Sequence, residues 1–164
     1  MSGGNSSHTR SDTLSDYWYI ESKLKAKVPF LKDFRSENER ALARDRMPLC
    51  IYVSGGISYV FLKYVDFVRM VNACNPGEGK CTTDDLFFCS NWYIWTEYNK
   101  DMPYKSTFID TQKKAAEEKK VPVLVVHEKG KKNDVCIMTL IDFISHLQPS
   151  VVFPKVGAEV VDAA

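Results

Sequence analysis

An aspartate, a glutamate and a lysine near the start of the chain are its best candidates for catalytic chemistry. Eight residues separate Asp12 from Glu21, and one residue separates Glu21 from Lys23. Side chains two apart on a β-strand share a face, so a strand here would present Glu21 and Lys23 together. Two carboxylates suit a hard divalent ion such as Mg²⁺. Oxygens of water and phosphate would complete its octahedral coordination. A nearby lysine can orient or help deprotonate an attacking water and offset charge on a phosphate.

This spacing also suits a simpler interpretation, an exposed strand edge that carries mixed charge. A basic cluster follows the candidate site, and it too has two interpretations. Its lysines could contact DNA phosphates, or they could belong to a solvated loop. The residues concerned are Lys25, Lys27 and Lys32, beside Lys23 itself.

The pattern of apolar residues and turn signals predicts the elements that position these side chains. Aromatic and β-branched residues indicate a strand at 17–23, and a proline suited to a first helical turn opens a helix at 29–46. That helix places Phe30, Phe34, Ala41 and Leu42 near one face. Two strands joined by Ser54-Gly55-Gly56 and a closing helix with an acidic cap candidate are predicted at 47–53, 59–63 and 66–71.

The chain repeats this pattern. Residues 17–53 align without a gap onto 91–127, with seven identities in 37 positions, whereas unrelated sequences would share about two. The match resumes two residues out of phase at Asp66-Phe67 and Asp142-Phe143. The identical pairs are Trp18 and Trp92, Tyr19 and Tyr93, Ile20 and Ile94, Pro29 and Pro103, Phe34 and Phe108, Ala41 and Ala115, and Pro48 and Pro122.

We therefore predict an α/β protein made of two tandem β-α-β-β-α units. The second unit has strands at 91–98, 121–127 and 134–139 and helices at 104–120 and 141–147. The expected organisation is a flexible N-terminus, a first unit, a connector, a second unit and a C-terminal arm. Their ranges are 1–10, 11–73, 74–81, 82–148 and 149–164.

The two copies differ where chemistry could occur. The first reads Glu21-Ser22-Lys23, whereas Trp95 and Glu97 occupy the acid and lysine positions of the second. We expect the second copy to be unable to catalyse, with Trp95 converting its former site into packing surface.

Both copies resemble the PD-(D/E)xK nuclease superfamily, in particular the small phage and archaeal enzymes similar to Holliday-junction resolvases. The resemblance covers Ser11-Asp12, Glu21-Ser22-Lys23, the strand–hairpin that follows and the Asp66-Phe67 helix, and it recurs in the second copy. It departs from the family at Ser11, where the motif has proline.

The resemblance implies a fold and an activity. The fold would be two restriction-endonuclease-like units packed as an intrachain pseudo-dimer. The activity would be metal-dependent hydrolysis of phosphodiesters in branched or recombining DNA. Asp12 and Glu21 would hold Mg²⁺, with Mn²⁺ as the alternative ion, and Lys23 would serve the water.

Composition sets broad limits. The net charge of +1 gives no general argument for nucleic acid, although residues 1–76 carry 11 Lys and Arg against 8 Asp and Glu. Five cysteines without a CxxC pair favour a reducing intracellular setting, in the host cytoplasm or a virion. No signal peptide or 18-residue apolar run occurs, so neither secretion nor a membrane partner is expected.

A non-catalytic descendant of such a nuclease is the competing hypothesis. It would bind DNA or assemble a virus particle, with the arm at 149–164 gripping a neighbour. The near-neutral charge and the short segment before Asp12, where family members carry a helix, favour it. The intact acid–lysine pair favours the enzyme. Whether several copies assemble stays open.

Overall fold

The computed structural model describes residues 18–24, 30–74, 91–98, 103–127 and 134–147 of the chain. The predicted order β-α-β-β-α occurs twice within them. The first half consists of β1 (Trp18–Leu24), α1 (Phe30–Leu42), β2 (Met47–Ser54), β3 (Ile57–Lys63) and α2 (Tyr64–Cys74). The second half consists of β4 (Trp92–Glu97), α3 (Tyr104–Glu117), β5 (Val121–Val126), β6 (Val135–Thr139) and α4 (Leu140–His146).

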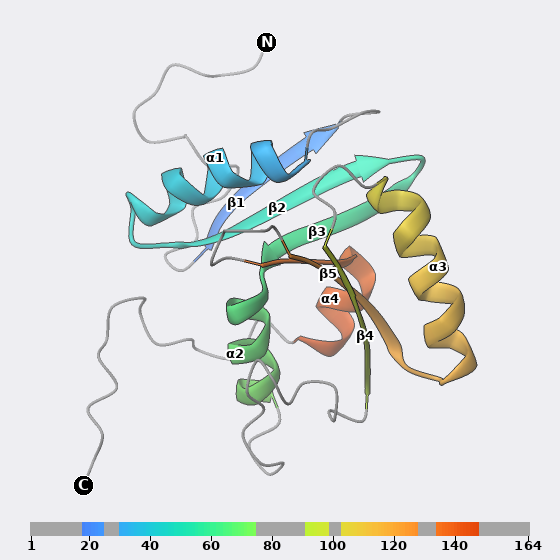
Figure 1. Ribbon diagram of the computed structural model, residues 1–164. Coiled ribbons are helices and arrows are strands. Elements are labelled where there is room, and N and C mark those ends of the chain that lie inside the picture. Colours follow the sequence, from blue (N-terminus) through green and yellow to red (C-terminus); the bar gives the residue numbers. More distant parts are fainter. Residues whose placement is uncertain (1–17, 25–29, 75–90, 99–102, 128–133, 148–164) are drawn as a thin grey trace, which may run out of the picture.

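All six strands form one mixed sheet in the order β1-β2-β3-β6-β5-β4 (Figure 1). The outer pairs, β1 with β2 and β4 with β5, are parallel, and α1 and α3 make their crossovers. The inner neighbours are antiparallel. The α/β class predicted from the sequence is therefore confirmed.

The strands of the two halves pair in the same register. Trp18 lies opposite Met47, and Trp92, 74 positions later, lies opposite Val121, also 74 positions later. The halves meet where β3 pairs with β6 and Phe61 lies opposite Ile137, its own counterpart in the out-of-phase alignment. The pairing is therefore symmetric about this central pair.

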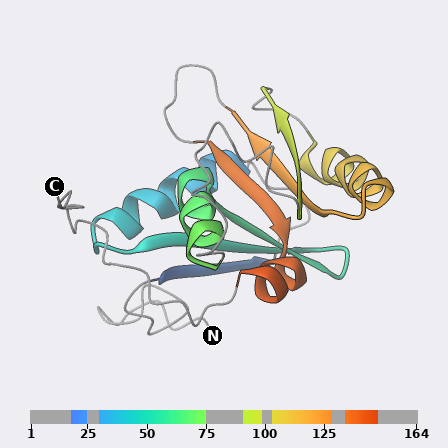
Figure 2. The same ribbon diagram turned by 90° about the horizontal axis from the view of Figure 1, so that it is seen from below.

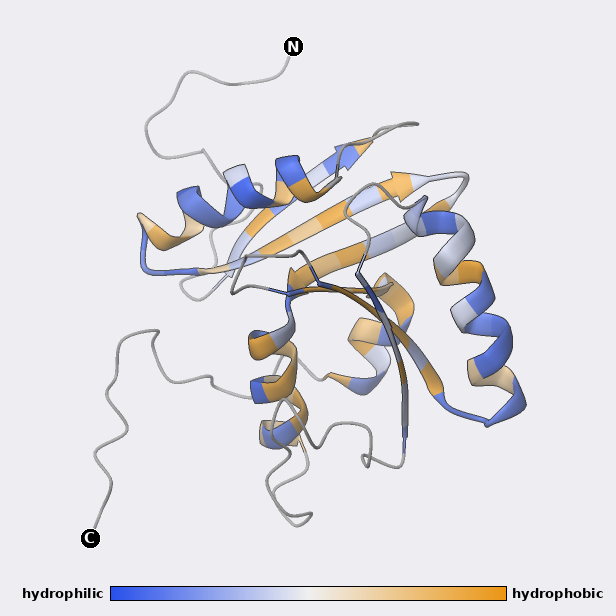
Figure 3. Cartoon of the chain, in the orientation of Figure 1, coloured by the Kyte–Doolittle hydropathy of each residue, from blue (hydrophilic) through white to orange (hydrophobic). Residues whose placement is uncertain are grey.

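Two apolar clusters cover the opposite faces of the sheet. Residues alternate between faces along a strand, so β3 sends Tyr59 and Phe61 to one cluster and Val60 and Leu62 to the other. The first cluster packs against α1 and α3, and the second against α2 and α4. Figures 1 and 2 show α2 and α4 on the same side of the strands, and Figure 3 shows hydrophobic residues along β2 and β5.

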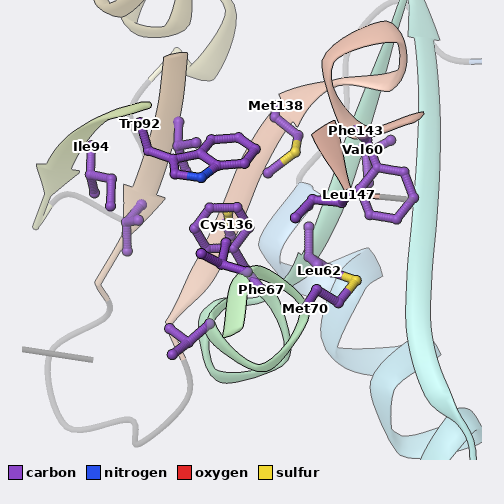
Figure 4. Packing of buried hydrophobic residues seen from close by; sticks show 14 of the residues in the cluster. Val60, Leu62, Phe67, Met70, Trp92, Ile94, Cys136, Met138, Phe143 and Leu147 are labelled. Atoms are coloured by element: carbon purple, nitrogen blue, oxygen red, sulfur yellow. The ribbon is translucent and has the colours of Figure 1, made fainter. Parts of the chain in front are cut away.

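The closing helix of each half makes an aromatic contact with the first strand of the other half. Phe67 of α2 contacts Trp92 of β4 edge-to-face, with ring centroids 5.0 Å apart (Figure 4). Phe143 of α4 makes the reciprocal contact with Trp18 of β1 at 6.2 Å. Such aromatic pairs add to the free energy gained from burial alone. Each half therefore completes the core of the other.

The longer helices end in the same way. Asp45 and Lys119, at matching positions, adopt left-handed backbone conformations with φ of 53° and 55°. The following amides of Arg46 and Lys120 donate to the carbonyls of Ala41 and Ala115 at 3.0 and 2.9 Å. These bonds satisfy carbonyls that the helix ends would leave unpaired.

The observed elements differ from the predictions mainly at helix boundaries. The first helix ends at Leu42 instead of residue 46, because the left-handed turn at Asp45 terminates it. Leu42, predicted to share a face with Phe34 and Ala41, is 50% exposed, whereas Glu37 is buried. Phe34 and Ala41 are buried as expected. The predicted N-terminus, most of the connector and the C-terminal arm lie outside the described residues.

None of the described helices is both long and apolar enough to cross a membrane.

The central pairing predicts that both halves unfold together. Phe61→Ala should lower the free energy of unfolding by about 3–5 kcal/mol, because it removes a fully buried ring at the junction. Tryptophan fluorescence and far-UV circular dichroism should follow one coincident urea transition, in the variant and the wild type alike. Ile141→Ala, on the exposed side of α4, is the matched control and should change stability by at most about 0.5 kcal/mol. Two separate transitions would contradict this account.

Burial also predicts which thiols react. It raises the pKa of the Cys50 thiol to about 12 and that of the Cys136 thiol well above its usual value, so little thiolate exists at pH 8. Cys74 is half-buried. Iodoacetamide should therefore label Cys74 in the native protein, and label Cys50 and Cys136 only after denaturation, as read by peptide mass spectrometry. Equal native labelling of Cys74 and Cys136 would show that the core opens readily.

Candidate functional site

The acid–lysine pair predicted from the sequence lies on β1, an outer strand of the sheet. Glu21 and Lys23 are opposite Cys50 and Tyr52 of β2, both members of the cluster under α1 and α3. Strand alternation therefore places both side chains on the face that α1 covers. Each is partly exposed, as expected at a sheet edge.

A buried acid on α1 binds the lysine. The ammonium Nζ of Lys23 donates to Oε1 of Glu37 at 2.7 Å. Arg40, one turn along the same helix, donates from one guanidinium nitrogen to both carboxylate oxygens at 3.1 Å. The hydroxyl of Tyr19 approaches Oε2 at 3.4 Å. Glu37 is only 1% exposed, so these donors replace the water that it loses.

This arrangement keeps Lys23 protonated. Burial disfavours the ammonium, but the hydrogen bond and charge of Glu37, together with the charges of Asp33 and Glu21, outweigh burial and raise the pKa of Lys23 above its usual value. Lys23 is therefore a fixed cation at neutral pH. It suits a role in offsetting phosphate charge better than a role as proton acceptor.

The neighbouring Tyr19 stays protonated and serves as a hydrogen-bond donor. Burial, and then the charges of Glu37 and Glu21, raise the pKa of Tyr19. The guanidinium of Arg44 lies over its ring at 5.0 Å from the centroid.

Matching positions of the second half carry different chemistry. Trp95 stands where Glu21 is, and its indole Nε1 donates to Oε1 of Glu97, which stands at the lysine position, at 2.7 Å. Nζ of Lys114, at the position of Arg40, lies 3.8 Å from the Trp95 ring centroid. Trp95 also packs against the apolar cluster. Thr111, in place of Glu37, donates to the carbonyl of Thr107 at 2.9 Å. Each of the four side chains at these positions therefore has a partner within the second half.

The remaining predicted site residues are only partly described. Lys32 lies on α1 with an exposed side chain, as a phosphate contact would require. Asp12, Lys25 and Lys27 lie outside the described residues. The structure thus brings Glu21 and Lys23 together and leaves the position of Asp12 undescribed.

In the part of the chain that the structure describes, no three His, Cys, Asp or Glu side chains converge as a metal site. Glu21 supplies a carboxylate on the outer strand β1, which matches part of the oxygen donor set of Mg²⁺. The second carboxylate predicted from the sequence, that of Asp12, lies outside the described residues.

Sequence reasoning missed Glu37, Tyr19 and Arg40 as parts of this site. The available signal was weak: an acid on the predicted helix three residues from both Phe34 and Arg40, with no apolar residue in its place. Its burial depends on where α1 packs, which the pattern of one helix does not show.

Comparison of the chain with protein-family models, with curated proteins and with solved structures finds no match.

The ion pair predicts a stability effect that depends on pH. Lys23→Met should cost about 1–3 kcal/mol at pH 7, because Glu37 then loses a donor inside the protein. A raised lysine pKa means that this contribution is complete below the usual value of about 10.5 and is lost as the pH rises through the raised value. The stability gap between wild type and variant should therefore stay constant from neutral pH to near that value and narrow above it.

Urea unfolding at a series of pH values measures this gap. Lys32→Met on the exposed side of α1 is the control and should change stability by at most about 0.5 kcal/mol at pH 7. A gap that is absent at pH 7 would mean that the Lys23–Glu37 contact contributes nothing.

Proposed function

We propose that this protein is a nuclease-like DNA-processing protein that hydrolyses phosphodiesters with a divalent metal ion, using one site in its first half. In this proposal the chain is an intrachain pseudo-dimer of two restriction-endonuclease-like units. Only the first unit keeps the acid–lysine pair. The observation that carries the proposal is the placement of Glu21 and Lys23 together on one face of an outer strand.

Repetition in the structure supports the pseudo-dimer. The halves share their order of elements, their strand registers and the left-handed helix ends at Asp45 and Lys119. Phe61 and Ile137 pair across the junction, and the closing helices exchange contacts. A duplicated unit that formerly paired with a second copy of itself accounts for all of these features.

The chemistry would be divided among few groups. Asp12 and Glu21 would hold Mg²⁺ or Mn²⁺, which polarises a phosphate oxygen and lowers the pKa of a bound water. Lys23, held as a cation by Glu37, offsets negative charge on the scissile phosphate. Lys32 on α1, and Lys25 and Lys27, would contact the flanking backbone of the DNA.

A single site limits what one chain can cut. Glu21 and Lys23 have no functional counterparts in the second half, where Trp95 and Glu97 bond each other. One chain should therefore cleave one strand per binding event, and it should nick a duplex.

The test is cleavage of supercoiled plasmid and of linear, flapped and four-way DNA with Mg²⁺ or Mn²⁺. Wild type should convert supercoiled plasmid to nicked circles. Glu21→Gln should lower the cleavage rate at least about 100-fold, because even loss of a residue that only orients a metal ligand lowers activity by up to that factor. Glu39→Gln, exposed on α1, is the matched control and should keep full activity. Activity that survives Glu21→Gln would remove this site from the proposal.

The second candidate function is a DNA-binding or virion assembly protein without catalysis. The observation that favours it is the ion pair between Lys23 and the buried Glu37, because this pair already neutralises the charge of Lys23 within the protein. Absence of cleavage on every substrate, combined with ordered assembly into larger particles, would support this function over the first.

A further inference from the structure

Glu37 is a buried acid that helix packing does not require. Its side chain is 2% exposed, and removing a carboxylate from water costs free energy unless donors replace the water. The matching residue of α3 is Thr111, equally buried, whose hydroxyl donates to the carbonyl of Thr107. The same kind of helix therefore packs on the same kind of parallel strand pair without an acid.

The acid occurs in the half that carries the lysine. Lys23 on β1 faces Glu37, whereas the second half has Glu97 at the lysine position and Thr111 at the acid position. A glutamate at 111 would add a second carboxylate near Glu97, in a half where no lysine occupies the position of Lys23. The buried acid therefore occurs together with the lysine, and packing of the helix on the sheet does not require it.

The contact with Glu37 fixes the position of the Lys23 ammonium, which would otherwise be mobile. Lysine has a flexible four-carbon stem, and among the described strands β1 pairs with β2 alone. The 2.7 Å bond to Glu37 holds the ammonium of Lys23 on the face that Glu21 shares, with 19% of the lysine side chain exposed. Arg40 and Tyr19 bond the same carboxylate and keep it in place.

We propose that Glu37 is the positioning residue of the candidate site, which holds the ammonium of Lys23 beside Glu21 before the DNA phosphate arrives. The inference rests on the proposed function, because the phosphate belongs to that reaction. Placing a charge in advance spares the reorganisation that would otherwise accompany the reaction. Polar and titratable groups that face Lys23 come from three elements: Tyr19 and Glu21 of β1, Asp33, Glu37 and Arg40 of α1, and Cys50 and Tyr52 of β2.

The test compares Glu37→Gln, which keeps size and removes charge, with Glu39→Gln two residues along the same helix. Glu37→Gln should lower kcat by about 10- to 100-fold, the usual cost of losing a residue that orients another. KM for plasmid DNA should stay within about twofold, because the phosphate-contacting lysines are unchanged. Glu37→Thr copies the residue of α3 and serves as the second variant if glutamine prevents folding.

A second readout does not depend on activity. Acylation of Lys23 by an acetyl N-hydroxysuccinimide ester at fixed pH, relative to exposed Lys32 in the same sample, should rise several-fold in folded Glu37→Gln. Lower kcat with constant KM and faster acylation supports the proposal. A folded Glu37→Gln with wild-type kcat or an unchanged acylation ratio overturns it. If the wild type cuts no DNA, the proposed function fails, and the acylation ratio alone decides whether Glu37 positions Lys23.

Discussion

The antiparallel pairing of β3 with β6 is the constraint on which the rest of this structure depends. At its centre Val60, Phe61 and Leu62 lie opposite Met138, Ile137 and Cys136, and all six are fully buried. Strands that are apolar on both faces cannot stand at an exposed edge without inviting association with other chains. The pairing removes both edges at once and turns two three-stranded pieces into one sheet.

This central pairing determines which strands remain at the outside. β1 and β4 become the edges, and each carries polar or charged residues on the face toward α1 or α3. Their opposite faces are covered by the exchanged aromatic contacts of α2 and α4. The candidate site therefore lies on an outer strand of the sheet that the described residues form.

One scaffold supports two different arrangements at matching positions. In the first half, a buried acid gathers a lysine, an arginine and a tyrosine, and in the second half an indole bonds a glutamate and carries a lysine over its ring. The apolar positions that form the sheet and its clusters are kept in both halves. The polar side chains along the edge strand and the covering helix differ between the halves, so the chemistry changes while the fold does not.

The sequence by itself determined the α/β class, the order of ten elements and the repeat. Those features depend on local patterns of apolar residues and turns, which a linear string contains. Placement of Glu21 and Lys23 on one face likewise needed only strand geometry. The tertiary structure alone decided that β3 and β6 join the halves, that the closing helices exchange partners, and that Glu37 binds Lys23. These contacts depend on how elements distant in sequence pack against one another. The periodicity of a single helix or strand shows which of its faces is apolar, but it does not specify which element packs against that face.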